Sequence, residues 1–270
     1  MAPTPTWAEA KLARVRELLE SLDSTLQTFR EEHPYRTEVS TNADDTKHFV
    51  HVFGVDQVST DAGLVAGEIL YHLRSVLDQM VYALVKANGG KPGNHTEFPI
   101  FSDPAGFQKG GVSKLRGVSP QARQAIESLQ PYQTSLPSID EWAIRRAIQS
   151  NPLFILNELA RIDRHRFMSV VRAFIEMQVP VMTPGHDRPN RGGGTSVVLS
   201  DGLQIYWCSY RAPTRPEDVT YPLVVHEVLD GEWDPEFAVH SEGGVPSAVT
   251  RLTGLADLVD TVVKDLSALL

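Results

Sequence analysis

The feature that most constrains the fold is a stripe of apolar side chains between residues 61 and 88. Its members recur every three or four positions, as Ile69, Leu73, Val76, Leu77, Met80 and Leu84. This spacing places them on one face of an α-helix, and other elements must cover that face. Gly89 and Gly90 indicate where the helix ends. The sequence therefore predicts a long amphipathic helix that belongs to a helical core.

Similar patterns predict helices elsewhere in the chain. We expect them over residues 7–32, 119–129, 138–149, 151–178 and 247–270. Thr6 is the expected N-cap of the first, because its hydroxyl could accept a hydrogen bond from the first turn. Pro120 and Pro152 suit the first turns of two others, where a missing N–H costs nothing. Pro180 ends the helix that begins at Asn151.

Extended segments alternate with these helices in two blocks. We expect strands over residues 35–41, 47–58, 195–200, 203–211, 221–229 and 236–240. The turn-forming tract 42–46 joins the first two into a hairpin, and Asp201-Gly202 predicts a second hairpin. Residues 183–194, rich in Gly, Pro and Asn, are interpreted as a surface loop. A phosphate-binding loop would need a helix directly after it.

Long helices and strands are segregated along the chain, which favours an α+β fold. We expect a helical bundle of about four long helices packed with an antiparallel sheet. The whole chain, 1–270, is predicted to form a single α+β domain. Its helical core spans about 61–178, and a strand-rich C-terminal part with the final helix spans about 195–270.

Composition restricts the classes of function. Lys and Arg number 25 against 34 Asp and Glu, giving a net charge of −9. Nucleic acid is therefore an unlikely partner, since phosphate contacts need clustered positive charge. The single cysteine, Cys208, excludes an intrachain disulfide and a zinc site built on cysteines. Without a signal-peptide pattern or roughly 20 uninterrupted apolar residues, we expect a cytoplasmic protein with no membrane partner.

The 151–178 segment carries charged residues inside an apolar run. On a straight helix, Asp163 falls at the centre of the face formed by Leu156, Leu159, Phe167, Val170 and Phe174. A carboxylate there is costly unless it is paired. Arg166 can reach it at i+3, and Arg74 and Asp78 flank the apolar stripe of the 61–88 helix. We therefore predict a buried ionic cluster of Arg74, Asp78, Asp163 and Arg166, which acts as a structural lock or as a site.

The opposite side of the same predicted helix carries Glu158, Arg161 and His165, the candidate catalytic residues. A metal-dependent enzyme is a further alternative, with Glu68, His72, Glu158 and His165 as ligands in the bundle core. The Glu-x-x-His spacing of carboxylate-bridged di-metal sites is absent. Walker, nucleophile-elbow, dinucleotide and His-Glu-x-x-His motifs are absent too. We expect neither a cofactor nor a resident metal.

Four linked stretches resemble a widespread bacterial family with no settled activity, which shares an "LRSALDHL"-like helix and a "DKHR"-like helix. They are residues 67–78 (GEILYHLRSVLD), 97–101 (EFPIF), 117–120 (GVSP) with 130–132 (QPY), and 156–166 (LNELARIDRHR). The resemblance covers about residues 35–175. It gives added weight to Arg74, Asp78, Asp163, His165 and Arg166 without implying a reaction.

A looser resemblance is to HEPN-type helical ribonucleases, which carry Arg and His on one helix at a dimer interface. Those enzymes place four to six residues between the two, whereas three separate Arg161 from His165. Our leading hypothesis is a binding or interaction module without assigned catalysis, with an unknown small molecule or protein as partner. A HEPN-like ribonuclease of a defence or toxin type, acting as a homodimer, is the alternative.

Overall fold

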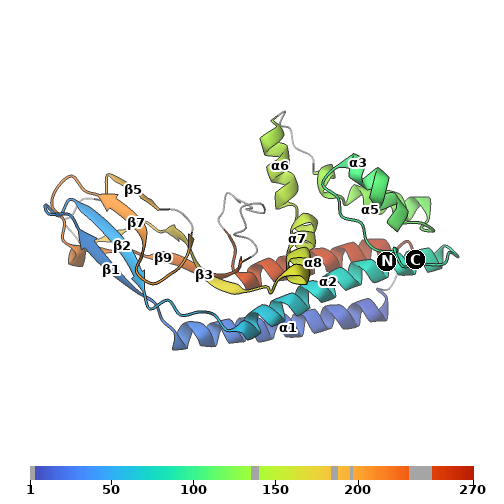
Figure 1. The fold of residues 1–270 in the computed structure, drawn as a ribbon, viewed down its shortest axis with the longest axis horizontal. Helices are drawn as coiled ribbons and strands as arrows, with labels where there is room; N and C mark the ends of the chain where they lie inside the picture. The colour runs from blue at the N-terminus through green and yellow to red at the C-terminus, as the bar shows by residue number, and fades with distance from the viewer. Residues whose placement is uncertain (1–3, 135–139, 184–187, 195–196, 231–244) are drawn as a thin grey trace.

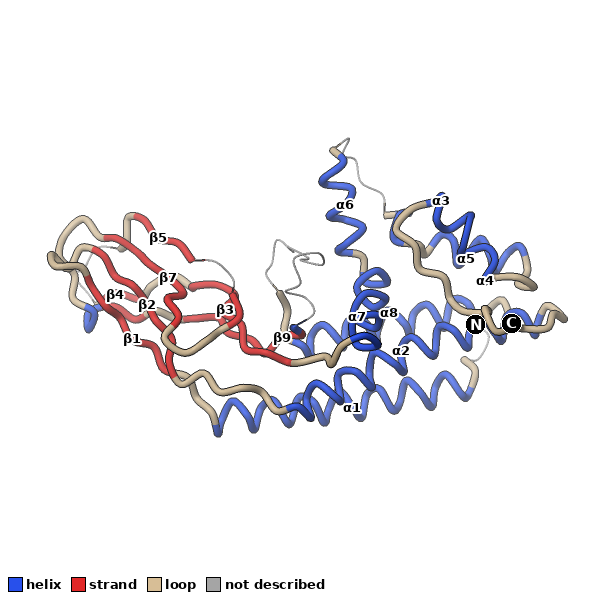
Figure 2. Tube along the Cα trace, in the orientation of Figure 1, coloured by secondary structure: helices blue, strands red, loops and turns tan. Residues whose placement is uncertain are grey.

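The computed structural model describes residues 4–134, 140–183, 188–194, 197–230 and 245–270. The molecule is elongated, with helices at one end and β-strands at the other (Figure 1). The two termini lie together at the helical end, far from the strands. The tube drawn by secondary structure shows the same division (Figure 2). The fold is an α+β mixture with antiparallel sheets, as the sequence predicts.

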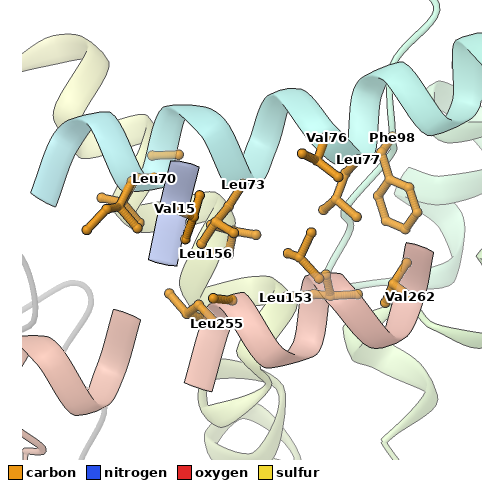
Figure 3. Close-up of a cluster of buried hydrophobic side chains, with 14 of the residues drawn as sticks. Val15, Leu70, Leu73, Val76, Leu77, Phe98, Leu153, Leu156, Leu255 and Val262 are labelled. Atoms are coloured by element: carbon orange, nitrogen blue, oxygen red, sulfur yellow. The ribbon is translucent and has the colours of Figure 1, made fainter. Parts of the chain in front are cut away.

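Three long helices form the helical end: α1 (Thr6–Glu32), α2 (Thr60–Ala87) and α8 (Ala248–Ser267). A shorter helix, α7 (Pro152–His165), packs on α2 and α8. Figure 3 shows Val15, Leu73, Leu156 and Leu255, one side chain from each helix, meeting in the core. Each buried side chain of this size contributes about 1.5–3 kcal/mol of transfer free energy. The apolar stripe of α2 is therefore covered as its spacing requires.

Short helical segments join α2 to α7: α3 (Pro104–Gly106), η1 (Phe107–Gly111), α4 (Val112–Lys114), α5 (Pro120–Ser128), η2 (Pro131–Gln133) and α6 (Glu141–Ser150). The start of α5 follows its sequence signal, since the Ser119 hydroxyl accepts a hydrogen bond from the N–H of Ala122. The expected cap of α1 is wrong. Pro5 occupies the N-cap position, and Thr6 is already helical.

The strands form one four-stranded sheet in the order β1-β2-β7-β5, and a three-stranded sheet in the order β6-β3-β9. Their bounds are β1 (Arg36–Thr41), β2 (Lys47–Phe53), β3 (Val170–Met177), β5 (Arg191–Gly194), β6 (Val197–Val198), β7 (Leu203–Ser209) and β9 (Leu223–Leu229). The short strands β4 (Val181–Met182) and β8 (Val219–Thr220) pair separately with each other, and the short 3-10 helix η3 (Pro216–Asp218) directly precedes β8. The predicted β1–β2 hairpin is confirmed.

The helix predicted to reach Gln178 is wrong, because α7 ends at His165. Arg166 has extended backbone angles, φ −150° and ψ 155°, and strand β3 begins at Val170. The β-branched residues of this stretch suit both a buried helix and a strand. Antiparallel pairing of β3 with β9 decides between them. The expected bundle of four long helices is not confirmed for the same reason.

Two loop predictions are also wrong. Asp201-Gly202 does turn the chain, with Gly202 at φ 76°, but β6 pairs with β3 and β7 pairs with β2 and β5. The glycines Gly192–Gly194 lie in strand β5, where a Cβ on Gly192 would collide with the Tyr206 hydroxyl. The strand expected over 236–240 lies outside the described residues.

The structure distributes helices and strands differently from the expected division at 61–178 and 195–270. The helical end draws α1 and α8 from the two ends of the chain, and the four-stranded sheet combines β1 and β2 with β5 and β7. None of the described helices is long and apolar enough to cross a membrane.

A buried ion pair joins the two ends of the molecule. Arg172 of β3 lies 3.5 Å from Glu227 of β9, and both side chains are almost fully buried. Arg172 also donates to the carbonyl of His33 at 2.6 Å, and Arg30 of α1 pairs with Glu227 at 2.8 Å. The guanidinium of Arg172 lies over the Phe29 ring, 4.4 Å from its centre. These contacts fix the three-stranded sheet against the end of α1.

Candidate functional site

A cavity of about 290 Å³ opens between α2, α7 and the segment that follows Glu97. Its lining consists of Tyr71, Arg74, Ser75, Asp78, Glu97, Ala160, Asp163 and Arg164. Helices α2 and α7 approach closely here because residue 67 is glycine. A Cβ at Gly67 would lie 2.6 Å from Oδ1 of Asp163, so any other residue at this position would displace the carboxylate from where it lies.

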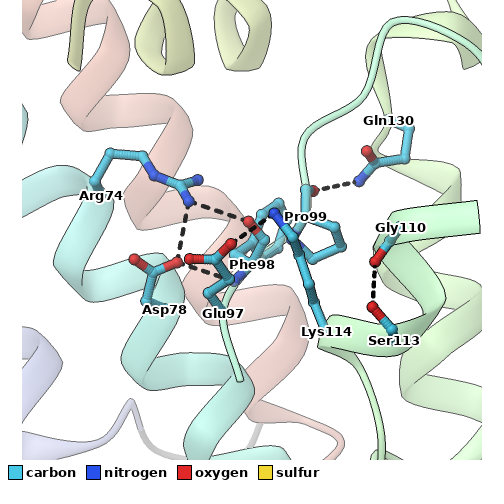
Figure 4. A network of polar contacts seen from close by, with 9 residues as sticks. All are labelled: Arg74, Asp78, Glu97, Phe98, Pro99, Gly110, Ser113, Lys114 and Gln130. Atoms are coloured by element: carbon cyan, nitrogen blue, oxygen red, sulfur yellow. Dashed lines mark hydrogen bonds and ion pairs between the residues drawn. The ribbon is translucent and has the colours of Figure 1, made fainter. Parts of the chain in front are cut away.

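Arg74 and Asp78 lie one turn apart on α2 and hold the neighbouring segment in place (Figure 4). Nη2 of Arg74 donates to Oδ1 of Asp78 at 3.1 Å and to the carbonyl of Phe98 at 3.1 Å. The N–H of Phe98 donates to the same carboxylate oxygen at 2.9 Å. Nζ of Lys114 lies 2.6 Å from Oε1 of Glu97. The charges of these four side chains are thereby paired.

Gln130, itself buried, anchors the same segment at its other end. Its side chain donates to the carbonyl of Pro99 at 2.9 Å and accepts from the N–H of Phe101 at 3.0 Å. Three of the stretches that carry the sequence resemblance, 67–78, 97–101 and 156–166, contribute residues to the lining of this cavity. A further stretch, 130–132, supplies Gln130, which holds the 97–101 segment. Their first physical role is to fix the walls of that cavity.

Asp163 is the exception among the charged groups of the lining. Within the described part of the chain, no hydrogen bond or ion pair involves its carboxylate, which lies against the backbone of α2. Burial raises the pKa of Asp163 above its ordinary value of 3.8. Burial also raises the pKa of Asp78, against the opposing effect of Arg74. Such perturbed carboxyls in a cavity are features of functional sites.

The structure brings together three members of the predicted ionic cluster and separates the fourth. Arg74, Asp78 and Asp163 all line the cavity, whereas Arg166 is exposed and lies outside the lining. The reason is the end of α7. Because Arg166 is already extended, it does not sit one helical turn above Asp163. The predicted buried cluster of four charged residues is therefore not formed, because Arg166 is not part of it.

The candidate catalytic residues lie away from the cavity. Arg161 pairs with Glu158 at 2.8 Å on the surface of α7, and His165 is exposed at its last residue. The alternative metal site is not formed. Among the described residues, which include Glu68, His72, Glu158 and His165, no group of three His, Cys, Asp or Glu side chains could hold a metal ion.

Tyr71, Glu97 and Arg164 belong to the lining, and sequence reasoning missed them as site residues. Tyr71 follows Gly67 by one turn on α2, and this spacing in the sequence could have placed it on the same helix face. In the structure its side chain is 66% exposed. Nε of Arg164 donates to the carbonyl of Ala160 at 3.2 Å. Glu97 could be placed only by the fold, because its segment is irregular.

A second polar cluster is buried at the strand end. Nδ1 of His48 lies 2.5 Å from the Tyr221 hydroxyl, and its Nε2 lies 2.6 Å from the carbonyl of Thr214. The Tyr221 and Tyr210 hydroxyls are 2.7 Å apart, and Cys208 contacts both. Burial raises the pKa of both tyrosines. These polar groups are buried and hydrogen-bond to one another and to the backbone, which fits a structural role.

Comparison with protein-family models, curated proteins and solved structures finds no significant match to this chain.

Proposed function

We propose that this protein is a binding module that holds a small polar ligand in the cavity between α2 and α7. The observation that carries the proposal is the Asp163 carboxylate, partly buried in that cavity without a partner among the described residues. Burial without pairing costs stability. Proteins tolerate such costs mainly where a site needs them. A volume of about 290 Å³ suits a ligand at the small end of the usual range of roughly 300–1,000 Å³.

A larger cavity, of about 530 Å³, lies at the junction of the two ends of the molecule. Its lining comes largely from residues 55–60, 167–172 and 198–201. The ionisable side chains there already have partners: Asp56 pairs with His33, Arg172 with Glu227, and Asp201 accepts from the N–H of Gly54. The smaller cavity is favoured because it has an unpaired charge to offer a ligand.

The cavity supports binding better than catalysis. Its one aliphatic hydroxyl, that of Ser75, accepts a hydrogen bond from Nζ of Lys11 at 2.5 Å across the α1–α2 contact. Burial lowers the pKa of Lys11, with Asp78 opposing that effect. A nucleophilic serine would also need donors aimed at a developing oxyanion. Of the Arg74 donors in the lining, Nη2 is already bonded to Asp78 and to the carbonyl of Phe98, and Nη1 is buried.

The test is protein-observed NMR on the full chain with a diverse set of small polar compounds. Binding in this cavity should shift the amide signals of Tyr71, Asp78 and Asp163 in a saturable way. The signals of the β1–β2 hairpin should stay in place. Compounds that shift only residues 55–60 and 167–172 would move the site to the larger cavity. A set with no binders would remove the proposal.

A HEPN-like ribonuclease is the second candidate, favoured by one observation. Arg161 and His165 lie one turn apart and exposed at the end of α7, where a second copy of the chain can reach them. Purified protein should then degrade RNA, and His165→Ala should abolish degradation while the exposed control His95→Ala does not. Absence of degradation, or a strictly monomeric protein, would remove this candidate.

A further inference from the structure

The charged side chains that line the α2–α7 cavity are paired, except for two neighbours on α7. Arg74 is matched by Asp78, and Glu97 by Lys114. Asp163 and Arg164 remain, and they differ in their surroundings. Arg164 is exposed to water and already donates to the carbonyl of Ala160. Asp163 is partly buried and, within the described residues, has no donor. Asp163 is therefore the lining carboxylate that is open to a positively charged ligand.

The packing of Asp163 limits the side from which a ligand can reach it. Its carboxylate lies against Gly67, so close that a single Cβ there would contact Oδ1 at 2.6 Å. The backbone of α2 thus excludes water from one side of the carboxylate and supplies no donor in return, because interior helical N–H groups are already bonded. Only the side facing the cavity remains open to a ligand.

An aromatic ring shares this cavity with the carboxylate. Tyr71 lines the same cavity, and its ring is 66% exposed rather than packed into the core. The face of an aromatic ring attracts ammonium and guanidinium groups. A carboxylate together with an aromatic wall is a pairing that suits an organic cation. An anion would find less. Nη2 of Arg74 is already bonded, and its Nη1, which has no acceptor among the described residues, is buried out of a ligand's reach.

From this arrangement we infer that the cavity binds a small organic cation, an alkylammonium or guanidinium group, with Asp163 as its counterion and Tyr71 as its aromatic wall. This inference rests on the proposed binding function and specifies the charge class of the ligand. The cavity volume limits the bound portion to a small group, so the cation is either a small molecule or the end of a longer one.

Three probes of equal chain length test the charge class: butylammonium chloride, sodium butyrate and 1-butanol. Each is titrated into the full-length protein at constant pH and ionic strength, and amide shifts are followed by NMR. Butylammonium should give saturable shifts at Gly67, Tyr71 and Asp163. Butyrate and butanol should bind at least tenfold more weakly, because neither supplies the missing positive charge.

Variants locate the effect. Asp163→Asn should weaken butylammonium binding at least tenfold, and Tyr71→Ala should weaken it several-fold. Asp23→Asn, which removes an exposed carboxylate from α1, should leave it unchanged and controls for net charge. The spectrum of each variant without ligand shows whether it is folded.

The outcomes separate this inference from the proposed function. If butyrate or butanol binds in the cavity at least as tightly as butylammonium, the binding module stands and the cation is wrong. If butylammonium binds equally well to Asp163→Asn, Asp163 is not the counterion of the bound cation. If none of the three shifts the cavity residues, the inference fails, and the wider compound set alone decides the proposed function.

Discussion

Substituting Gly63 tests the course of the chain after α7, the point at which the structure departs most from the sequence prediction. Gly63 lies in the first turn of α2, against the segment that leads into β3. A Cβ placed there would come much closer than 3.0 Å to the carbonyl oxygen of Met168, and 3.0 Å from the ring of Phe167. Gly63→Ala should therefore force the two segments apart.

The expected magnitude combines two opposing contributions. Alanine in a helix is more favourable than glycine by roughly 0.5–1 kcal/mol. Overpacking costs roughly 1–3 kcal/mol and occasionally more. The upper end applies because the obstacle is a backbone carbonyl, which cannot rotate away as a flexible side chain can. The net loss should be about 2 kcal/mol in the free energy of unfolding, or roughly 4–8 °C in melting temperature for a domain of this size.

The assay is thermal and denaturant unfolding of the wild type, Gly63→Ala and Gly254→Ala. Gly254 is an exposed glycine of α8, and a Cβ there meets nothing within 4 Å. It should therefore show only the propensity gain of roughly 0.5–1 kcal/mol. If Gly63→Ala proves as stable as Gly254→Ala, Met168 does not cover Gly63, and the assigned end of α7 is wrong.

Three further predictions follow from buried polar groups. Asp163→Asn should raise stability at pH 7, because burial raises the pKa of this carboxyl above 3.8 and asparagine cannot ionise. In the wild type the folded state holds this proton more tightly than the unfolded state, so its stability falls as the pH rises through the raised pKa. The stability gain of Asp163→Asn should therefore shrink when denaturant titrations are repeated at about pH 3. Glu227→Ala should cost roughly 3–5 kcal/mol in chemical unfolding, since it strands the buried charge of Arg172. Tyr221→Phe should cost roughly 1–3 kcal/mol in the same assay, because Nδ1 of His48 loses its buried partner.

Each of these has a control and a contrary result. If Asp163→Asn destabilises the protein at pH 7 and does so more than at about pH 3, the carboxylate is paired in the folded state. Arg30→Ala removes the half-exposed partner of Glu227 and should cost much less than Glu227→Ala; equal costs would mean that burial does not dominate. Tyr82→Phe changes a tyrosine that is 50% exposed and should leave the free energy of unfolding nearly unchanged. If Tyr221→Phe is equally neutral, the buried hydrogen bond to His48 does not contribute to stability.

The sequence by itself determined the elements whose signals are local. Helices α1, α2 and α8 follow from apolar spacing, and α5 from the Ser119 cap, because both signals act within a few residues. The β1–β2 hairpin follows from its turn residues. Arg74 and Asp78 were identifiable as neighbours, since positions i and i+4 share a helix face.

Only the tertiary structure decided what depends on distant partners. Residues 166–178 fit a helix by spacing, but residues 170–177 pair antiparallel with β9, and α7 ends at His165. That ending removes Arg166 from the cavity and leaves Asp163 in the lining, with Tyr71, without an arginine partner among the described residues. Periodicity places a side chain on a face of its own helix, whereas the partner it meets depends on where the chain turns, and long-range strand pairing sets that turn.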